Sequence, residues 1–93
     1  MKKKIGFLID LNRDDIFYLT FKNIISEFKK KNIDIKVIDI SFSKKINLKQ
    51  KKILLKYKTL FNLNRFNFYQ PKNIYDFEGI FSKEKIILFY NYI

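Results

Sequence analysis

A strand, a helix and a second strand are expected from residues 4–39, which read KIGFLIDLNRDDIFYLTFKNIISEFKKKNIDIKVID. Near the start of this stretch, Ile5, Phe7 and Ile9 occupy alternate positions, which is the period of a strand with one buried face. The helix that follows carries apolar residues at helical spacing, at Phe17, Phe21, Ile24, Ile25 and Phe28. The stretch therefore begins a domain that combines helices with a sheet.

Charged and polar residues mark both ends of this helix. Asp14 or Asp15 suits the N-cap, where an acid also favours the positive end of the helix dipole. Lysines 29–31 suit the negative C-terminus, and Asn32 tolerates the left-handed backbone that ends many helices. After Asn32, the apolar pattern changes phase at residues 37–38, which predicts either a bulge or a strand buried on both faces.

The next segment is unusual in its charge. No acidic residue occurs between Ser41 and Tyr75, and the basic residues between Asp39 and Asp76 are Lys44, Lys45, Lys49, Lys51, Lys52, Lys56, Lys58, Arg65 and Lys72. These nine charges, with +3 from the residues before them and −1 from those after, make up the net charge of +11. Charge this concentrated favours binding to a polyanion such as RNA or DNA, although a solvated lysine-rich loop explains it equally well.

The remaining elements extend the order to βαββαβ. Residues 44–58 fit either a long twisted hairpin or a short helix, and the pattern does not decide between them. A strand is expected within residues 59–69, a short helix from Pro71 and a final strand in residues 86–93. We therefore predict one α+β domain spanning residues 1–93, a ferredoxin-like βαββαβ sandwich. The lysine-rich segment at about residues 41–60, here called the basic arm, would lie between strands two and three as an extended hairpin or a short helix.

Missing residue types exclude several kinds of chemistry. The chain has neither Cys nor His, which rules out disulfides, thiol nucleophiles, cysteine-bound zinc and histidine general bases. Residues 10–15 contain no glycine, so the first strand is not followed by a dinucleotide or phosphate-binding motif. Asp10, Asp14 and Asp15 could bind Mg²⁺, but strand-end and helix-capping roles explain them more simply. We expect no cofactor and no enzymatic activity.

Aromatic residues lie among the basic ones, a mixture that can stack on bases while contacting phosphates. For Phe66 and Phe68, packing in the core is the simpler interpretation. For Tyr57, base stacking and core packing are equally good explanations. On this basis the candidate RNA-binding residues are Lys44, Lys45, Lys49, Lys51, Lys52, Lys56, Tyr57, Lys58 and Arg65.

The order of these features resembles the family of small-subunit ribosomal protein ten. Residues 4–35 run beside the family pattern without a gap, and Lys58 and Phe61 match the basic residue and phenylalanine that begin its return strand. The chain departs from the family at Ile40 and Phe42, where the turn prolines are missing, and at Lys85, which replaces a glycine. The resemblance implies a ferredoxin-like domain whose central hairpin extends into ribosomal RNA.

The function implied by this resemblance is a structural constituent of the small ribosomal subunit head. Its partners would be the ribosomal RNA of the small subunit and neighbouring small-subunit proteins, with no membrane and no small-molecule substrate. The absence of Ala, Cys, His and Trp beside abundant Lys, Ile, Asn and Phe indicates a very A+T-rich gene. We therefore expect this protein to be encoded by an organelle and to lie in a mitochondrial ribosome, or otherwise to lie in the bacterial cytoplasm.

An enzyme half is the alternative interpretation. Residues 3–10, followed by a helix and a strand, also resemble the start of many glycosyltransferases and ATP-grasp ligases. In such a Rossmann-like fold the first two strands are adjacent and parallel. In the ferredoxin-like fold the first strand instead lies between the third and fourth, with antiparallel pairing. A third interpretation, a basic module on anionic membranes, would need an amphipathic basic helix that the pattern does not reveal.

Overall fold

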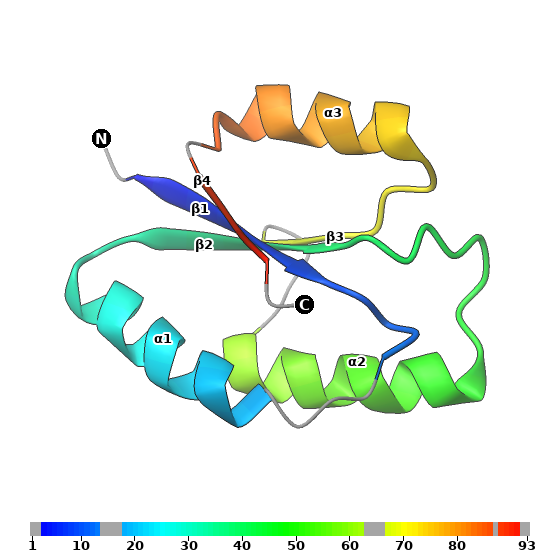
Figure 1. Ribbon diagram of the computed structural model, residues 1–93, viewed down its shortest axis with the longest axis horizontal. Coiled ribbons are helices and arrows are strands. Elements are labelled where there is room, and N and C mark those ends of the chain that lie inside the picture. The colour runs from blue at the N-terminus through cyan, green and yellow to red at the C-terminus, as the bar shows by residue number, and fades with distance from the viewer. Residues whose placement is uncertain (1–2, 14–17, 63–66, 87, 92–93) are drawn as a thin grey trace.

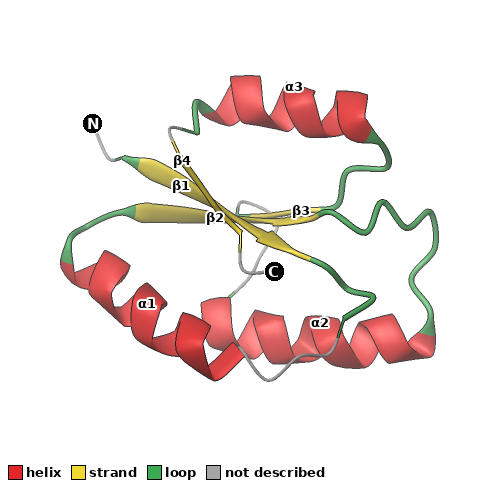
Figure 2. Ribbon diagram, in the orientation of Figure 1, coloured by secondary structure: helices red, strands yellow, loops and turns green. Residues whose placement is uncertain are grey.

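The computed structural model describes residues 3–13, 18–62, 67–86 and 88–91. Four strands form one sheet with helices on both faces (Figures 1 and 2). Helices α1 and α2 lie on one face, and α3 lies on the other. The order along the chain is β1(Lys4–Ile9), α1(Tyr18–Lys30), β2(Asp34–Asp39), α2(Leu48–Phe61), β3(Phe68–Tyr69), α3(Ile74–Glu84) and β4(Leu88–Asn91). The prediction of a domain that combines helices with a sheet is confirmed at this level.

All three strand pairs in the sheet are parallel. The strand order is β3-β2-β1-β4, so β1 lies between β2 and β4. Residue Phe7, for example, pairs with Val37 on one side and with Tyr90 on the other. The ferredoxin-like sandwich is therefore wrong, because that fold requires antiparallel pairs and places β1 between the third and fourth strands. The observed adjacency of β1 and β2 is the arrangement expected for the Rossmann-like alternative.

The main core lies between the sheet and the α1–α2 layer. Ile5, Phe7 and Ile9 are buried there, as their alternation predicted. The ring of Phe7 meets Phe28 of α1 edge to face, with centroids 5.9 Å apart. From the α2 side the core receives Ile53, Leu54 and Tyr57. This packing explains why both helices cover the same face of the sheet.

Helix α1 confirms the sequence-based helix prediction in the part that the structure describes. Ile25 is buried and Phe28 packs against the core, while Asn32 adopts the expected left-handed backbone with φ of 56°. The predicted caps Asp14 and Asp15 lie outside the described residues. In β2, Val37 and Ile38 are both fully buried and the strand register is continuous, so the change of phase reflects burial on both faces.

The basic arm is a helix and not an extended hairpin. Residues 48–61 form α2, and Asn47 caps it. Its side chain accepts from the backbone N–H of Gln50, whose own side chain accepts from the backbone N–H of Asn47, which completes a capping box. Asn62 ends the helix in the left-handed conformation. Of the two structures that fit this segment, the helix is observed. The extended hairpin that the resemblance implied is wrong, because these caps and the apolar face at Ile53, Leu54 and Tyr57 stabilise a helix on the sheet.

The last two strands are shorter than predicted. The strand expected within residues 59–69 is limited to Phe68–Tyr69 in the described residues, and Phe61 belongs to α2. Pro71 precedes Asn73, the N-cap of α3, and does not lie in the first turn. None of the helices that the structure describes is long and apolar enough to cross a membrane.

Candidate ligand site at the carboxyl edge of the sheet

The parallel sheet gathers three connecting loops at one edge. Because every strand runs in the same direction, the segments that follow β1, β2 and β3 all leave from its carboxyl edge (Figure 1). The chain passes from β1 to β2 through α1 on one face, and from β3 to β4 through α3 on the other. The strand order thus reverses beside β1, which is where open α/β sheets bind their ligands.

A buried carboxylate ties two of these loops together. Asp39, the last residue of β2, is 2% exposed. Its Oδ1 accepts from the backbone N–H of Leu11 at 3.3 Å and from that of Ser41 at 3.0 Å. Its Oδ2 accepts from the Ser41 hydroxyl at 2.8 Å. Asp39 therefore fixes the loop after β1 against the loop after β2, since a buried charge of this kind is stable only with several donors.

The hydrogen-bond chain continues from Ser41 to the start of α2. The hydroxyls of Ser41 and Ser43 are 3.0 Å apart, and Gln50 Nε2 donates to Ser43 Oγ at 2.7 Å. The Ser41 hydrogen is already donated to Asp39, so Ser43 must donate to Ser41 and accept from Gln50. Gln50 Nε2 also donates to Asn12 Oδ1 at 2.8 Å. One connected network thus holds the β1–α1 loop, the β2–α2 loop and the N-terminus of α2.

The outer side of this edge is polar and cationic. Asn12 and Arg13 are exposed in the loop after β1, and Lys44 and Lys45 are exposed in the loop after β2. Asp10 is half-buried, and its carboxylate accepts from the backbone N–H of Asn12 at 2.8 Å. The edge therefore offers amide and hydroxyl groups beside three basic side chains, a combination suited to a hydroxylated ligand that carries phosphate.

Phe42 gives the same loop a strained backbone. Its φ is 53°, in the left-handed region that side chains other than Gly, Asn and Asp rarely occupy. Such residues persist where the surrounding contacts over-determine the conformation, and they cluster at binding sites. Here the flanking residues Ser41 and Ser43 are held by the network described above. The strain at Phe42 is consistent with a loop shaped for a ligand.

The eight predicted RNA-binding residues that the structure describes fall into three groups. Lys44 and Lys45 lie in the loop before α2, beside the carboxyl edge. Five more are exposed on α2 itself: Lys49, Lys51, Lys52, Lys56 and Lys58. Tyr57 is 6% exposed and belongs to the core, so its ring does not lie on the surface. Arg65 lies outside the described residues.

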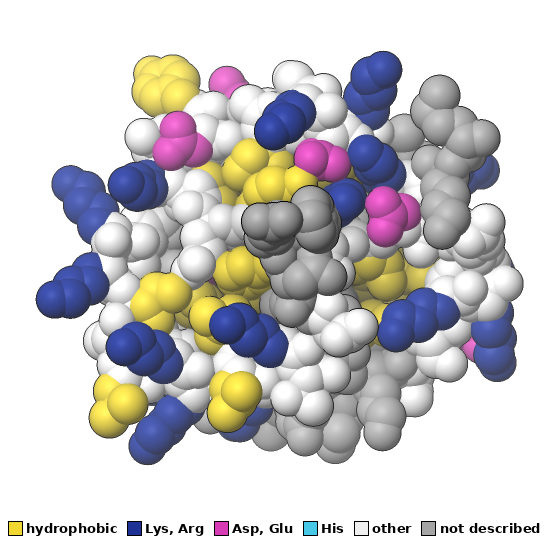
Figure 3. All heavy atoms as spheres, turned by 180° about the vertical axis from the view of Figure 1, so that it is seen from behind, with side chains coloured by type: hydrophobic (Ala, Val, Ile, Leu, Met, Phe, Trp, Pro, Cys, Tyr) yellow, Lys and Arg dark blue, Asp and Glu magenta, His cyan; other side chains and the backbone are white. Residues whose placement is uncertain are grey.

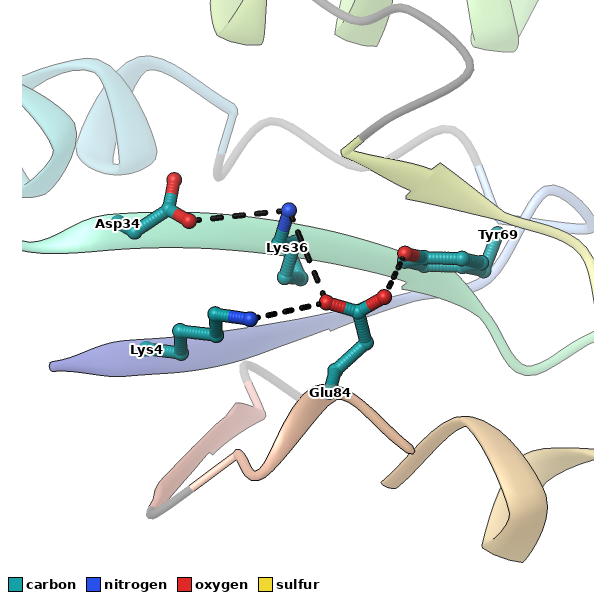
Figure 4. Close-up of polar contacts among 5 residues, drawn as sticks. All are labelled: Lys4, Asp34, Lys36, Tyr69 and Glu84. Carbon is teal, nitrogen blue, oxygen red and sulfur yellow. Dashed lines mark hydrogen bonds and ion pairs between the residues drawn. The ribbon is translucent and has the colours of Figure 1, made fainter. Parts of the chain in front are cut away.

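A second polar cluster lies on the opposite face of the sheet, under α3 (Figure 4). Glu84 accepts from the Tyr69 hydroxyl and from Lys4 Nζ at 3.2 Å, and Lys36 Nζ lies 3.8 Å from it. Asp34 lies 3.7 Å from Lys36. A groove of about 510 Å³ opens beside this cluster, between α3 and the end of β3. We interpret the cluster as structural, because its charges pair with one another.

Protonation in this cluster follows from its contacts. The hydrogen bond from Tyr69, with the hydrogen bond from Lys4 and the positive charges of Lys36 and Lys4, holds the pKa of Glu84 below its usual value against the opposing effect of burial. Burial and the Glu84 carboxylate raise the pKa of Tyr69 to about 12. Glu84 is therefore charged and Tyr69 neutral at neutral pH, which is the state in which the hydroxyl can donate.

Sequence reasoning missed the residues that build the carboxyl edge. Asp39, Ser43 and Gln50 were not singled out, although an acid at the end of a strand and an Asn-x-x-Gln capping box were both readable signals. The magnesium candidates Asp14 and Asp15 lie outside the described residues, within which no cluster of three metal-ligating side chains occurs.

No protein family, no curated protein and no solved structure matches this chain.

Proposed function

We propose that this chain is the ligand-binding, Rossmann-like half of an enzyme of the glycosyltransferase or ATP-grasp kind. The observation that carries the proposal is the parallel strand order β3-β2-β1-β4, with a built polar network where the order reverses. This order is that of the first four strands of a doubly wound nucleotide-binding sheet.

The ligand that suits this edge is a sugar phosphate or sugar nucleotide. The exposed Asn12 can donate from its amide Nδ2 to sugar hydroxyls, and Arg13, Lys44 and Lys45 present charges that complement phosphate. The loop after β1 has no glycine and carries Asp10. A pyrophosphate therefore cannot be bound there as in a dinucleotide fold, where glycines let the backbone approach it closely.

Equilibrium binding to a panel of small ligands tests the proposal. The panel contains UDP-glucose, ATP, glucose 1-phosphate, inorganic phosphate and unmodified glucose. We expect at least one phosphorylated sugar or nucleotide to bind better than inorganic phosphate or glucose alone. The double variant K44Q/K45Q should weaken that binding by roughly tenfold, because each charge-assisted contact contributes about 1.5–3 kcal/mol when fully formed and less when exposed.

The matched control removes the same charge elsewhere. Lys72 and Lys83 are exposed and lie in or beside α3, so K72Q/K83Q changes the net charge equally and leaves the carboxyl edge intact. Equal losses in both double variants would indicate non-specific attraction and would contradict a site at this edge. Failure of every phosphorylated ligand to bind would contradict the proposed function as well.

A structural role in the small ribosomal subunit is our second proposal, and it rests on the positive charge of residues 41–75. Its expected scaffold, a ferredoxin-like sandwich with an extended hairpin, differs from the parallel sheet and the helix α2. What supports it is the exposure of the lysines on α2 and the lack of acids from Ser41 to Tyr75. Co-sedimentation with small ribosomal subunits at moderate salt is the direct check, and its absence would remove this proposal.

A further inference from the structure

Helix α2 presents an apolar stripe to solvent between two rows of lysines. Leu48 and Leu55 are 70% and 65% exposed and lie seven residues apart, so both point away from the sheet on the same side of the helix. The opposite side, with Ile53, Leu54 and Tyr57, packs in the core. The outward leucines therefore take no part in holding α2 to its own domain.

Lysines flank this stripe on both sides. By helical geometry Lys51 and Lys58 lie along one side of the leucines, and Lys49, Lys52 and Lys56 lie along the other. All five are exposed, and α2 contains no acidic residue. Figure 3 shows basic and apolar side chains side by side over the part of α2 at the lower left of that view. The surface is thus cationic at its margins and apolar along its centre.

This combination favours an anionic lipid surface over a nucleic acid. Phosphates of RNA or DNA would contact the lysines but would leave two large leucines in water between them. The headgroup region of a bilayer accepts both, because lysines meet anionic headgroups while apolar side chains enter the boundary with the acyl chains. We propose that α2 is a peripheral membrane-docking helix, with Leu48 and Leu55 inserted at headgroup level and its five lysines bound to anionic lipid.

The distribution of charge supports this orientation. Helix α2 carries five lysines and no acid, whereas α3, on the other face of the sheet, carries Asp76, Glu78 and Glu84 against one lysine, Lys83. A negatively charged surface therefore attracts the α2 side of the molecule more strongly than the α3 side. This proposal does not depend on which ligand binds at the carboxyl edge.

Vesicle flotation with the whole chain tests the proposal. We expect the protein to bind vesicles made of equal parts phosphatidylcholine and phosphatidylglycerol and not to bind vesicles of phosphatidylcholine alone. The variant L48S/L55S should bind the anionic vesicles on the order of tenfold more weakly, because burial of apolar side-chain area is lost. The variant K52Q/K56Q should weaken binding by about fivefold for each lysine removed.

Two controls separate docking from general effects. Ile74 is an exposed apolar residue on α3, so I74S should leave vesicle binding unchanged. A single-stranded RNA is titrated in parallel, and L48S/L55S should not alter whatever affinity the parent has for it. Circular dichroism confirms that α2 is retained in each variant, which the exposure of both leucines leads us to expect.

Each result of these binding experiments either supports or overturns the docking helix. Loss of anionic vesicle binding in L48S/L55S, with RNA affinity and helix content unchanged, supports a docking helix. Equal binding of L48S/L55S and the parent to anionic vesicles overturns the proposal, because the leucines then have no role. Equal binding of the parent to neutral and anionic vesicles also overturns it. RNA binding with no vesicle binding assigns the lysines to nucleic acid and overturns it too.

Discussion

At the scale of single residues, Asp39 connects two loops at the carboxyl edge of the sheet. It is buried, accepts three hydrogen bonds and joins the loop after β1 to the loop after β2. A carboxylate in this position is stable because backbone and hydroxyl donors replace the water that it loses. Its neighbours in the network, Ser43 and Gln50, then hold α2 against the same edge.

Replacing Asp39 tests whether it organises the carboxyl edge. In D39A the backbone N–H groups of Leu11 and Ser41 lose a buried acceptor, so the free energy of unfolding should fall by about 2–4 kcal/mol in urea titrations. The matched control is D10N, because Asp10 is half-buried and accepts one local bond from Asn12. D10N should cost less than about 1 kcal/mol. A D39A variant as stable as the parent would contradict the structural role of Asp39.

At the scale of elements, Glu84 ties the C-terminal end of α3 to the sheet. No residue within α3 is buried, but the Glu84 side chain is 13% exposed and lies among Tyr69, Lys4 and Lys36. The side chain of Lys36 is 11% exposed, and the carboxylates of Glu84 and Asp34 lie close enough to compensate its charge. The cluster therefore fixes the end of α3 from which the chain turns into β4.

Neutralising Glu84 should loosen α3. E84Q removes the negative charge that pairs with Lys4 and Lys36 under α3, and should lower the free energy of unfolding by about 1–3 kcal/mol at neutral pH. E78Q, an exposed substitution on the same helix, should change it by less than about 0.5 kcal/mol. Equal effects of the two substitutions in chemical denaturation would show that the cluster does not stabilise the fold.

The pH dependence of E84Q has a defined sign. Because the folded protein lowers the pKa of Glu84, its contribution is present above the ordinary glutamate pKa of about 4.3. It is lost as the pH falls through the lower folded value. The difference in stability between parent and E84Q should therefore shrink on acidification.

At the alkaline end, Tyr69 contributes stability that is present below about pH 10 and lost as the pH rises towards its folded pKa of about 12.

The sequence predicted some of these elements and not others. The alternation in β1 and the apolar stripe of α1 were clear, because each has one buried face. Helix α2 was ambiguous for a physical reason. Its buried side includes a polar residue, Gln50, and its exposed side includes Leu48 and Leu55, so the apolar pattern no longer follows one face. The capping box at Asn47 and Gln50 was the stronger local signal.

At the scale of the whole molecule, helix α2 determines the topology of the sheet. If residues 44–58 formed a hairpin, two strands would follow one another along the chain with no helix between them. Strands connected in this way usually pair antiparallel. With α2 in place, strands and helices alternate along the whole chain, and this alternation is typical of a parallel sheet. The candidate site follows from the same fact, because only the parallel sheet brings Asn12, Ser43 and Lys44 to one edge. No local pattern shows these residues as neighbours.

Amide chemical-shift mapping by NMR tests the central claim most directly, using the phosphorylated ligand from the panel that binds best. The ligand-binding account predicts that the amides of Leu11, Asn12, Ser41 and Ser43 shift together during the titration, with little change along α3. The account would be contradicted if the shifts were confined to the exposed lysines of α2, or to Tyr75 and Lys83 beside the groove under α3.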